Sequence, residues 1–128
     1  MNGIDNKALD FLQQIRAMIE SGRGAPMVVK LGVDLVEVER GHAVFVGTPD
    51  RSVYNPLGVV HGGYAATLLD SACGIAVHSQ LSPGRSHSTL ELKVSYLRGL
   101  TAGSGTVPCG RPGDVPGAAC RLRRGDAA

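Results

Sequence analysis

The sequence predicts an α+β domain in which antiparallel strands surround one buried helix. Two runs rich in β-branched residues flank a turn at Gly41, as in a hairpin. Residues 61–80 are apolar on nearly every side, which is typical of a helix that other elements enclose. Residues 87–98 alternate apolar and polar side chains, as a strand does. A chain of 128 residues favours one domain, which we place at 1–107.

The first expected element is an amphipathic helix over residues 5–21. Leucine and isoleucine recur there every three or four positions with polar residues between them, and the Ser21–Gly24 segment ends the pattern. The hairpin follows over 33–48 and ends before Pro49 and Asp50. We expect the helix to cap the core that the hairpin helps to form.

The central helix and the strand after it complete the predicted core. Many side chains of the helix over 61–80 are small, which lets a sheet wrap closely around it. The Ser82–Gly84 segment closes the helix, and the strand over 87–98 follows. One face of that strand carries Leu90, Leu92, Val94 and Tyr96.

The last part of the chain, residues 108–128, breaks this pattern. A third of it is Pro or Gly, and neither alternation nor a helical stripe continues. Because Pro lacks the N–H that a β-ladder needs and Gly has no side chain to pack, we expect an irregular tail. The C-terminal strands of the sheet would then be missing or altered. We hypothesise that the tail is a shifted or truncated reading frame, which resequencing of the coding region would test.

Charge and composition exclude several classes of function. Residues 1–107 carry nine Lys or Arg against nine Asp or Glu, so the net charge of +2 comes entirely from the tail. Without a basic face, and with aromatic residues at only 4%, we expect no nucleic-acid partner. The polar residues within 59–81 argue against a membrane span, and the His spacings fit no metal site. No secretory signal is visible, so we expect a cytoplasmic protein with reduced thiols.

Asp70 is the first candidate for chemistry. It is the only formally charged residue between Arg51 and Arg85, and it falls in the middle of the enclosed helix. Burial of an unpaired carboxylate is costly, so such a residue points to a functional site. The alternative is an Asp that only accepts hydrogen bonds from neighbouring Ser or backbone groups. We expect this carboxylate to act as the base or nucleophile that attacks a carbonyl.

The glycine pair Gly62–Gly63 at the start of the same helix is the second candidate. The first N–H groups of a helix have no partner within it and lie at its positive end. Glycine lets a substrate carbonyl approach them without meeting a Cβ. The pair predicts an oxyanion hole for acyl transfer, in which one donor lowers the barrier by about 3 kcal/mol. Taken alone, the glycines fit a tight loop-to-helix turn at least as well.

The spacing of the two candidates predicts an oligomer. Asp70 lies eight residues beyond Gly62. That is about 12 Å along a helix axis, whereas reacting groups must come within roughly 3–3.5 Å of each other. One chain therefore cannot supply both groups to one carbonyl carbon. Two chains related by a two-fold axis can, with Gly62 of one chain facing Asp70 of the other.

The order and spacing of these residues resemble a known family. The run N-P-x-G-x-x-H-G-G-x-x-x-x-x-x-D begins at Asn55 and ends at Asp70, and T-L-E-L-K-V-S-Y-L-R follows over Thr89–Arg98. Across residues 27–107 the chain is similar to hotdog-fold acyl-CoA thioesterases of the PaaI-like and 4-hydroxybenzoyl-CoA thioesterase type. The resemblance implies a hotdog fold and hydrolysis of aryl or medium-chain CoA thioesters. It also implies a homodimer or homotetramer that uses no metal and no cofactor.

The resemblance further implies roles for single residues. Gly62 would donate its N–H to the thioester carbonyl, and His61 would shape the loop. Asn55 would position the thioester or the attacking water. Asp70 would be the nucleophile or general base, with the hydroxyl of Thr89 assisting it. The residues expected to bind substrate are Gly63, Tyr64, Leu68 and Arg98. Tyr64 and Leu68 would line an acyl pocket or pack in the core. Arg98 would contact CoA phosphates.

Two alternative functions stay open at this point. A hotdog hydratase typically has an Asp-x-Asn-Pro-x-His loop, but Val53 and Gly58 stand where the Asp and His are needed, which argues against it. A non-catalytic acyl-CoA binding protein or a degraded hotdog protein is favoured by the altered C-terminal region. Release of free thiol from acyl-CoA substrates separates hydrolysis from binding alone.

Overall fold

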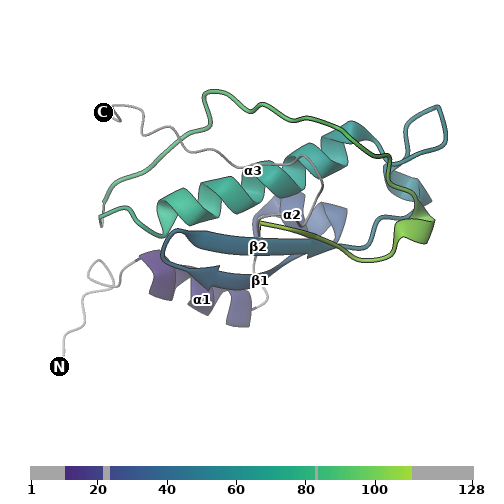
Figure 1. The fold of residues 1–128 in the computed structure, drawn as a ribbon. Coiled ribbons are helices and arrows are strands. Elements are labelled where there is room, and N and C mark those ends of the chain that lie inside the picture. Colours follow the sequence, from purple (N-terminus) through teal and green to yellow (C-terminus); the bar gives the residue numbers. More distant parts are fainter. Residues whose placement is uncertain (1–10, 22–23, 83, 111–128) are drawn as a thin grey trace.

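The computed structural model describes residues 11–21, 24–82 and 84–110 (Figure 1). Its helices are α1 (Phe11–Glu20), α2 (Pro26–Leu31) and α3 (Gly62–His78). Its strands are β1 (Val33–Glu39), β2 (His42–Gly47) and β3 (Val107–Cys109). Single 3-10 turns lie at Arg51–Val53 and Ala102–Ser104. The part of the expected first helix that covers residues 5–10 lies outside the described residues.

The three strands form one antiparallel sheet in the order β1–β2–β3 (Figure 1). β1 and β2 are a hairpin with a bulge between Leu35 and Glu37, and they lie within the 33–48 segment where the sequence predicts one. The turn is made at Gly41, whose φ of 76° is unfavourable for residues with a Cβ. Glycine is therefore required at this turn.

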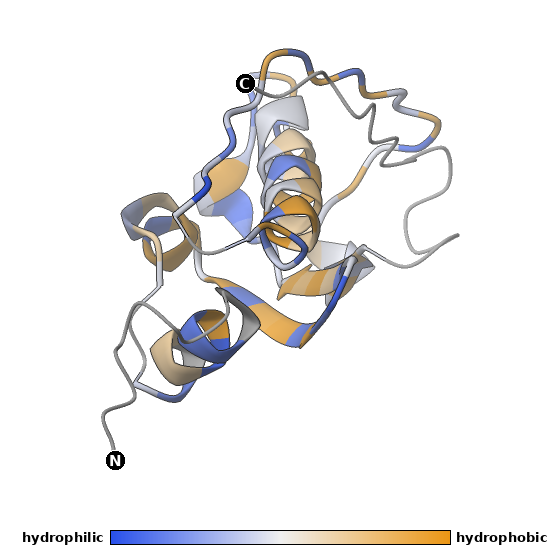
Figure 2. Cartoon of the chain, turned by 90° about the vertical axis from the view of Figure 1, so that its left-hand side faces the viewer, coloured by the Kyte–Doolittle hydropathy of each residue, from blue (hydrophilic) through white to orange (hydrophobic). Residues whose placement is uncertain are grey.

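α3 packs against one face of the sheet, and α1 lies on the other side of the strands (Figures 1 and 2). Four residues of α3 are buried, and they lie on one side of the helix: Tyr64, Leu68, Leu69 and Ala72. They share one core with Val33 of β1, Phe45 of β2 and Cys109 of β3. This one-sided burial differs from the fully enclosed helix that the sequence predicts, and it leaves a second face of α3 away from the sheet.

The connection from residue 85 to 99 runs across that second face of α3. Figure 2 shows it on the side of the helix opposite the strands, with alternating hydrophobic and hydrophilic residues. The sequence predicts a strand over 87–98, but the structure forms none there. A strand needs a neighbour for its backbone N–H and C=O groups, and the described sheet already ends at β3, beside β2. Leu90 is accordingly 95% exposed, although the alternating pattern over 87–98 predicts that its side chain faces the core.

The structure also corrects the start of the predicted tail over 108–128. Pro108 and Cys109 belong to β3, and Cys109 pairs with Phe45 at 1% exposure. Proline is tolerated there because β3 is an edge strand of the described sheet, so its missing N–H breaks no ladder bond on the outer side. Residues 111–128 lie outside the described part of the chain.

α2 is an element for which the sequence analysis makes no prediction. Pro26 is its first residue, and Gly32 just beyond its end has a φ of 66°, which caps its last turn. Proline just inside the start and glycine just past the end of a helix are a recognised signal. With only six residues, the helix is too short for its side chains to show a periodicity.

Two further findings concern cysteines and membranes. Cys73 on α3 is disulfide-bonded, so the expectation of reduced thiols does not hold there, whereas Cys109 is buried and forms no disulfide. Among the described helices, none has both the length and the apolar character needed to cross a bilayer.

The contact between Gly47 and Tyr64 makes a stability prediction. A Cβ added at Gly47 would overlap the Tyr64 hydroxyl, which is buried and makes no hydrogen bond to any described residue. We expect Gly47→Ala to lower the free energy of unfolding by about 1–3 kcal/mol, as overpacking of a core does. Urea denaturation measures this, with Gly99→Ala as the control, because a Cβ there meets nothing within 4 Å. Equal stability of the two variants would show that Tyr64 moves freely.

Candidate functional site

The loop before α3 is held in shape by Asn55. Its side-chain Oδ1 accepts hydrogen bonds from the N–H groups of Leu57 at 2.9 Å and Val59 at 3.4 Å, and its own N–H donates to the Val59 carbonyl at 2.8 Å. Gly58 completes the turn with a φ of 85°. The carboxamide oxygen is thus used inside the loop, which leaves the amide nitrogen of Asn55 as the group that can reach a substrate.

His61 is the residue that begins α3. It is the N-cap, and its Nδ1 accepts a hydrogen bond of 2.8 Å from the Gly63 N–H, which places the ring proton on Nε2. The His61 N–H donates to the Val53 carbonyl at 2.8 Å, and the Tyr64 N–H donates to the His61 carbonyl at 3.0 Å. These bonds join the loop to the start of α3 through His61.

The N–H of Gly62 stays available at this helix start. The next two N–H groups, of Gly63 and Tyr64, both have partners, but the Gly62 N–H makes no hydrogen bond to any described residue. The positive end of the α3 dipole adds partial positive charge at this donor. The helix start can therefore stabilise a partial negative charge on an incoming oxygen.

Asp70 lies on the face of α3 that the connection over 85–99 crosses. Its side chain is half-buried, while its neighbours Leu68 and Leu69 are buried against the sheet. The hydroxyl of Thr89 donates to Asp70 Oδ1 at 2.8 Å. The carboxylate is therefore held by Thr89 and is not enclosed in the core of its own subunit.

The two groups are far apart within the chain. α3 is continuous from Gly62 to His78, so the rise along it applies without a break and separates Gly62 from Asp70 by about 12 Å. The structure brings Thr89 to Asp70 and His61 to Gly63, but it does not bring Asp70 to Gly62 in one chain.

A pocket of about 360 Å³ opens beside the helix start. It includes Gly62 and, among the predicted residues, also His61 and Arg98. Its apolar walls come from α3 and the loop before it, and from the connection and the residue that follows it: Val60, Ala65, Leu69, Val94, Leu97 and Leu100. Tyr64 and Leu68, at 4% and 1% exposure, instead lie in the core. Ala65 and Leu69 line the pocket instead, each one residue further along the helix and so turned by about 100°, although Leu69 also belongs to the core.

Tyr96 is a residue of this pocket to which the sequence analysis assigns no role. Its hydroxyl donates to the Gly62 carbonyl at 2.7 Å, and its ring lies against Gly62. Its partner stands 34 positions earlier in the chain, and no local pattern connects the two. The sequence offers one signal for a role of Tyr96: it lies in the Thr89–Arg98 run that resembles the family.

Few groups around the site have shifted pKa values. Burial, and to a lesser extent the charge of His87, lowers the pKa of His78, whose ring meets that of His87 edge-on at 4.9 Å. Hydrogen bonds from Ser52 lower the pKa of Asp50. Burial, with a smaller effect of the Asp50 charge, raises the pKa of Tyr64. His78 lies at the C-terminal end of α3, whereas Tyr64 lies in its first turn and Asp50 at the start of the loop that leads to it.

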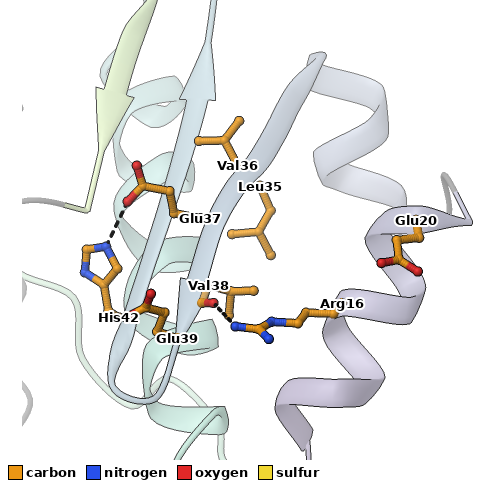
Figure 3. Close-up of a pocket in the computed structure, with 8 residues that line it drawn as sticks. All are labelled: Arg16, Glu20, Leu35, Val36, Glu37, Val38, Glu39 and His42. Carbon is orange, nitrogen blue, oxygen red and sulfur yellow. Dashed lines mark hydrogen bonds and ion pairs between the residues drawn. The ribbon is translucent and has the colours of Figure 1, made fainter.

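A second pocket of about 450 Å³ lies between α1 and the hairpin (Figure 3). Arg16 crosses it to donate to the Val38 carbonyl at 3.2 Å, and His42 meets Glu37 at 3.2 Å. None of the predicted site residues lines it.

Comparison with known proteins shows which proteins this chain resembles. Residues 57–109, which run from the loop through α3 to the end of β3, match the family model of the thioesterase superfamily. This part of the chain is similar to thioesterases of that superfamily. Over 73 residues the chain is 30% identical to the 1,4-dihydroxy-2-naphthoyl-CoA hydrolase of Listeria monocytogenes, an alignment that covers 57% of this chain and 59% of that protein.

Solved structures of the superfamily share the fold. The PaaI protein of the E. coli phenylacetic acid degradation operon superposes with a TM-score of 0.62 at 28% identity, over 75% of this chain and 64% of that one. A thioesterase family protein of Silicibacter pomeroyi superposes with a TM-score of 0.63 at 27% identity, over 75% and 67%. The α+β hotdog fold predicted from the sequence is thereby confirmed. The chain spans less than two thirds of the length of the Listeria and E. coli relatives.

Proposed function

We propose that this protein hydrolyses an acyl-CoA thioester to a free acid and CoA. One observation carries the proposal: a single helix presents, at its glycine start, an N–H that bonds to no described residue and, two turns later, a carboxylate held by the Thr89 hydroxyl. The match of residues 57–109 to the thioesterase superfamily model supports it, as does similarity to a CoA hydrolase. The cytoplasmic location expected from the sequence stays part of this proposal.

Each residue has a proposed part in the reaction. The Gly62 N–H receives the thioester carbonyl oxygen and stabilises the charge that develops on it. Asp70 is the general base or the nucleophile, and Thr89 holds its carboxylate. His61 fixes the helix start through Gly63.

Asn55 and the pocket bind the rest of the substrate. The free amide nitrogen of Asn55 positions the thioester or the attacking water. The apolar pocket receives the acyl group, for which its volume of about 360 Å³ accommodates an aryl or a medium-chain group. Arg98 at the rim is proposed to contact CoA phosphates, because a guanidinium suits a phosphate.

The proposed enzyme is a homodimer, or a homotetramer built from such pairs. A separation of about 12 Å along α3 prevents Gly62 and Asp70 of one chain from acting on one carbonyl. Across a two-fold axis, two antiparallel α3 helices bring each Gly62 to the partner's Asp70 and form two equivalent sites.

The second candidate function is non-catalytic binding of acyl-CoA. Two features favour it: β3 is short, and the connection over 85–99 does not form the strand predicted for 87–98. The described sheet is therefore smaller than the one that the amino-acid sequence predicts. The pocket and the Gly62 N–H would then hold a thioester without hydrolysing it.

A panel of aryl and aliphatic acyl-CoA esters tests the proposed function. Thiol release is followed with a chromogenic thiol reagent, and binding is measured by calorimetry with the same esters. Turnover of at least one ester supports the hydrolase. Binding without turnover supports the second candidate, and neither binding nor turnover with any ester would rule out both.

Complementation of two defective variants tests the shared site. Asp70→Asn lacks the carboxylate charge and Gly62→Pro lacks the N–H, so each homodimer has two broken sites. After the variants are unfolded, mixed in equal amounts and refolded, half of the dimers are mixed, and one site of each mixed dimer is intact. We expect the mixture to regain about a quarter of wild-type activity. A mixture no more active than its components would refute a site shared between subunits, provided that wild-type protein refolded alongside regains full activity.

A further inference from the structure

We propose that Tyr96 is a positioning residue of the thioesterase site and holds Gly62 in the orientation that its N–H needs to receive a thioester carbonyl. This proposal rests on the proposed function and extends it to a residue outside the motif at the helix start.

Tyr96 reaches Gly62 in two ways. Its hydroxyl donates a hydrogen bond of 2.7 Å to the Gly62 carbonyl. Its ring lies so close that a Cβ built on Gly62 would stand 3.1 Å from the ring Cζ, tighter than an ordinary contact. Glycine at position 62 therefore serves the approach of Tyr96 as well as the approach of a substrate.

The glycine pair explains why such a contact is needed. Two consecutive glycines give the substrate access, but they also leave the backbone with wide freedom in φ and ψ. An oxyanion donor is effective only when it is oriented before the reaction. The chain must therefore restrict Gly62 from outside the pair.

Bonds on both sides of Gly62 provide part of that restriction. His61 donates from its N–H to the Val53 carbonyl, and its ring accepts from the Gly63 N–H, both at 2.8 Å. These bonds fix the residues before and after Gly62. The Tyr96 hydroxyl adds a bond on Gly62 itself, and the ring restricts movement of its Cα.

The connection that carries Tyr96 also carries Thr89, which bonds to Asp70. One segment, which forms no strand, thus contacts both proposed catalytic groups of the same chain. It contacts the carboxylate with one hydroxyl and the helix start with the other. The side chains of this segment, and not a β-ladder, connect it to α3.

Tyr96→Phe tests the role, because it keeps the ring and removes the hydrogen bond. We expect kcat to fall about tenfold, a part of the 10²–10³-fold loss that removal of a whole donor causes, while KM changes less than twofold. The factor by which kcat falls should be the same for every acyl-CoA that the enzyme turns over, because the orientation of the donor affects the thioester carbonyl, which all these substrates have. An unchanged kcat would refute the positioning role of Tyr96. A loss of kcat that differs between short and long acyl groups would also refute it and would indicate that Tyr96 is a wall of the acyl pocket.

Tyr54→Phe is the matched control. The Tyr54 hydroxyl accepts a hydrogen bond of 2.7 Å from the Ala102 N–H, and Tyr54 does not line the pocket at Gly62. We expect kcat of this variant to stay within twofold of the wild type. An equal loss in both variants would mean that any lost tyrosine hydroxyl weakens the fold, and the proposal would be wrong.

A measurement without substrate separates this proposal from the proposed function. In ¹⁵N relaxation experiments we expect the order parameter of the Gly62 N–H to fall in Tyr96→Phe from the value of about 0.85 typical of a rigid backbone towards 0.6. Failure of every acyl-CoA to react would refute the hydrolase and leave this result standing. An unchanged order parameter would refute the role of Tyr96 even in an active enzyme.

Discussion

Asparagine in place of Asp70 is expected to lower kcat for acyl-CoA hydrolysis by about 10²–10⁴-fold, the range that a positioned acid or base contributes. Asparagine has nearly the same shape, and its oxygen can still accept the hydrogen bond that Thr89 donates to Asp70 at 2.8 Å. The helix and its contact with the connection are therefore retained, and only the negative charge is lost. Thiol release at saturating substrate measures the effect.

Asp34→Asn is the control for the loss of a carboxylate in general. Asp34 is exposed on β1, at the edge of the sheet, and its replacement should leave kcat within twofold of the wild type. The thermal unfolding midpoints of both variants should match the wild type. Equal rates for Asp70→Asn and the wild type would show that this carboxylate takes no part in the reaction.

Proline in place of Gly62 is expected to lower kcat by about 10²–10³-fold, the cost of losing one oxyanion donor. Proline has no N–H and is well suited to the first position of a helix. His61, with φ of −59° and ψ of 135°, already has the extended conformation that a residue before proline requires. The Cβ of proline meets the tip of Tyr96, a half-exposed side chain that can move aside.

Gly62→Ala separates the lost donor from the added bulk. Alanine brings the same Cβ toward Tyr96 but keeps the N–H, so its effect reports on the contact alone. We expect a loss of no more than about tenfold, well below the cost of a whole donor. Similar losses in Gly62→Pro and Gly62→Ala would mean that crowding, and not the N–H, explains the effect.

Part of this structure follows from local sequence patterns. The β-branched runs on either side of Gly41 predict the hairpin, because a glycine with positive φ allows the turn within a few residues. The long apolar stretch before Ser79 predicts α3, because its length and composition suit a helix whatever packs on it. The order of Asn55, Gly62 and Asp70 likewise identifies the candidate site without any knowledge of the fold.

Other features depend on contacts between distant residues. The alternation over 87–98 predicts a strand, but a strand also needs a partner, and the described sheet ends at β3. One-sided burial of α3 likewise depends on which elements cover it, so the exposure of Asp70 could not be predicted from an apolar stretch.

The amino-acid sequence alone determined the motif that resembles thioesterases, the central helix and the two groups, Gly62 and Asp70, that lie too far apart on it to act within one chain. Tertiary structure decided how these groups are held: Thr89 at the carboxylate and Tyr96 at the glycine start, from 19 and 34 positions along the chain. The physical reason is the distance along the chain over which each effect acts. Helix propensity and spacing act over a few residues, whereas a side-chain hydrogen bond depends on how the whole chain packs.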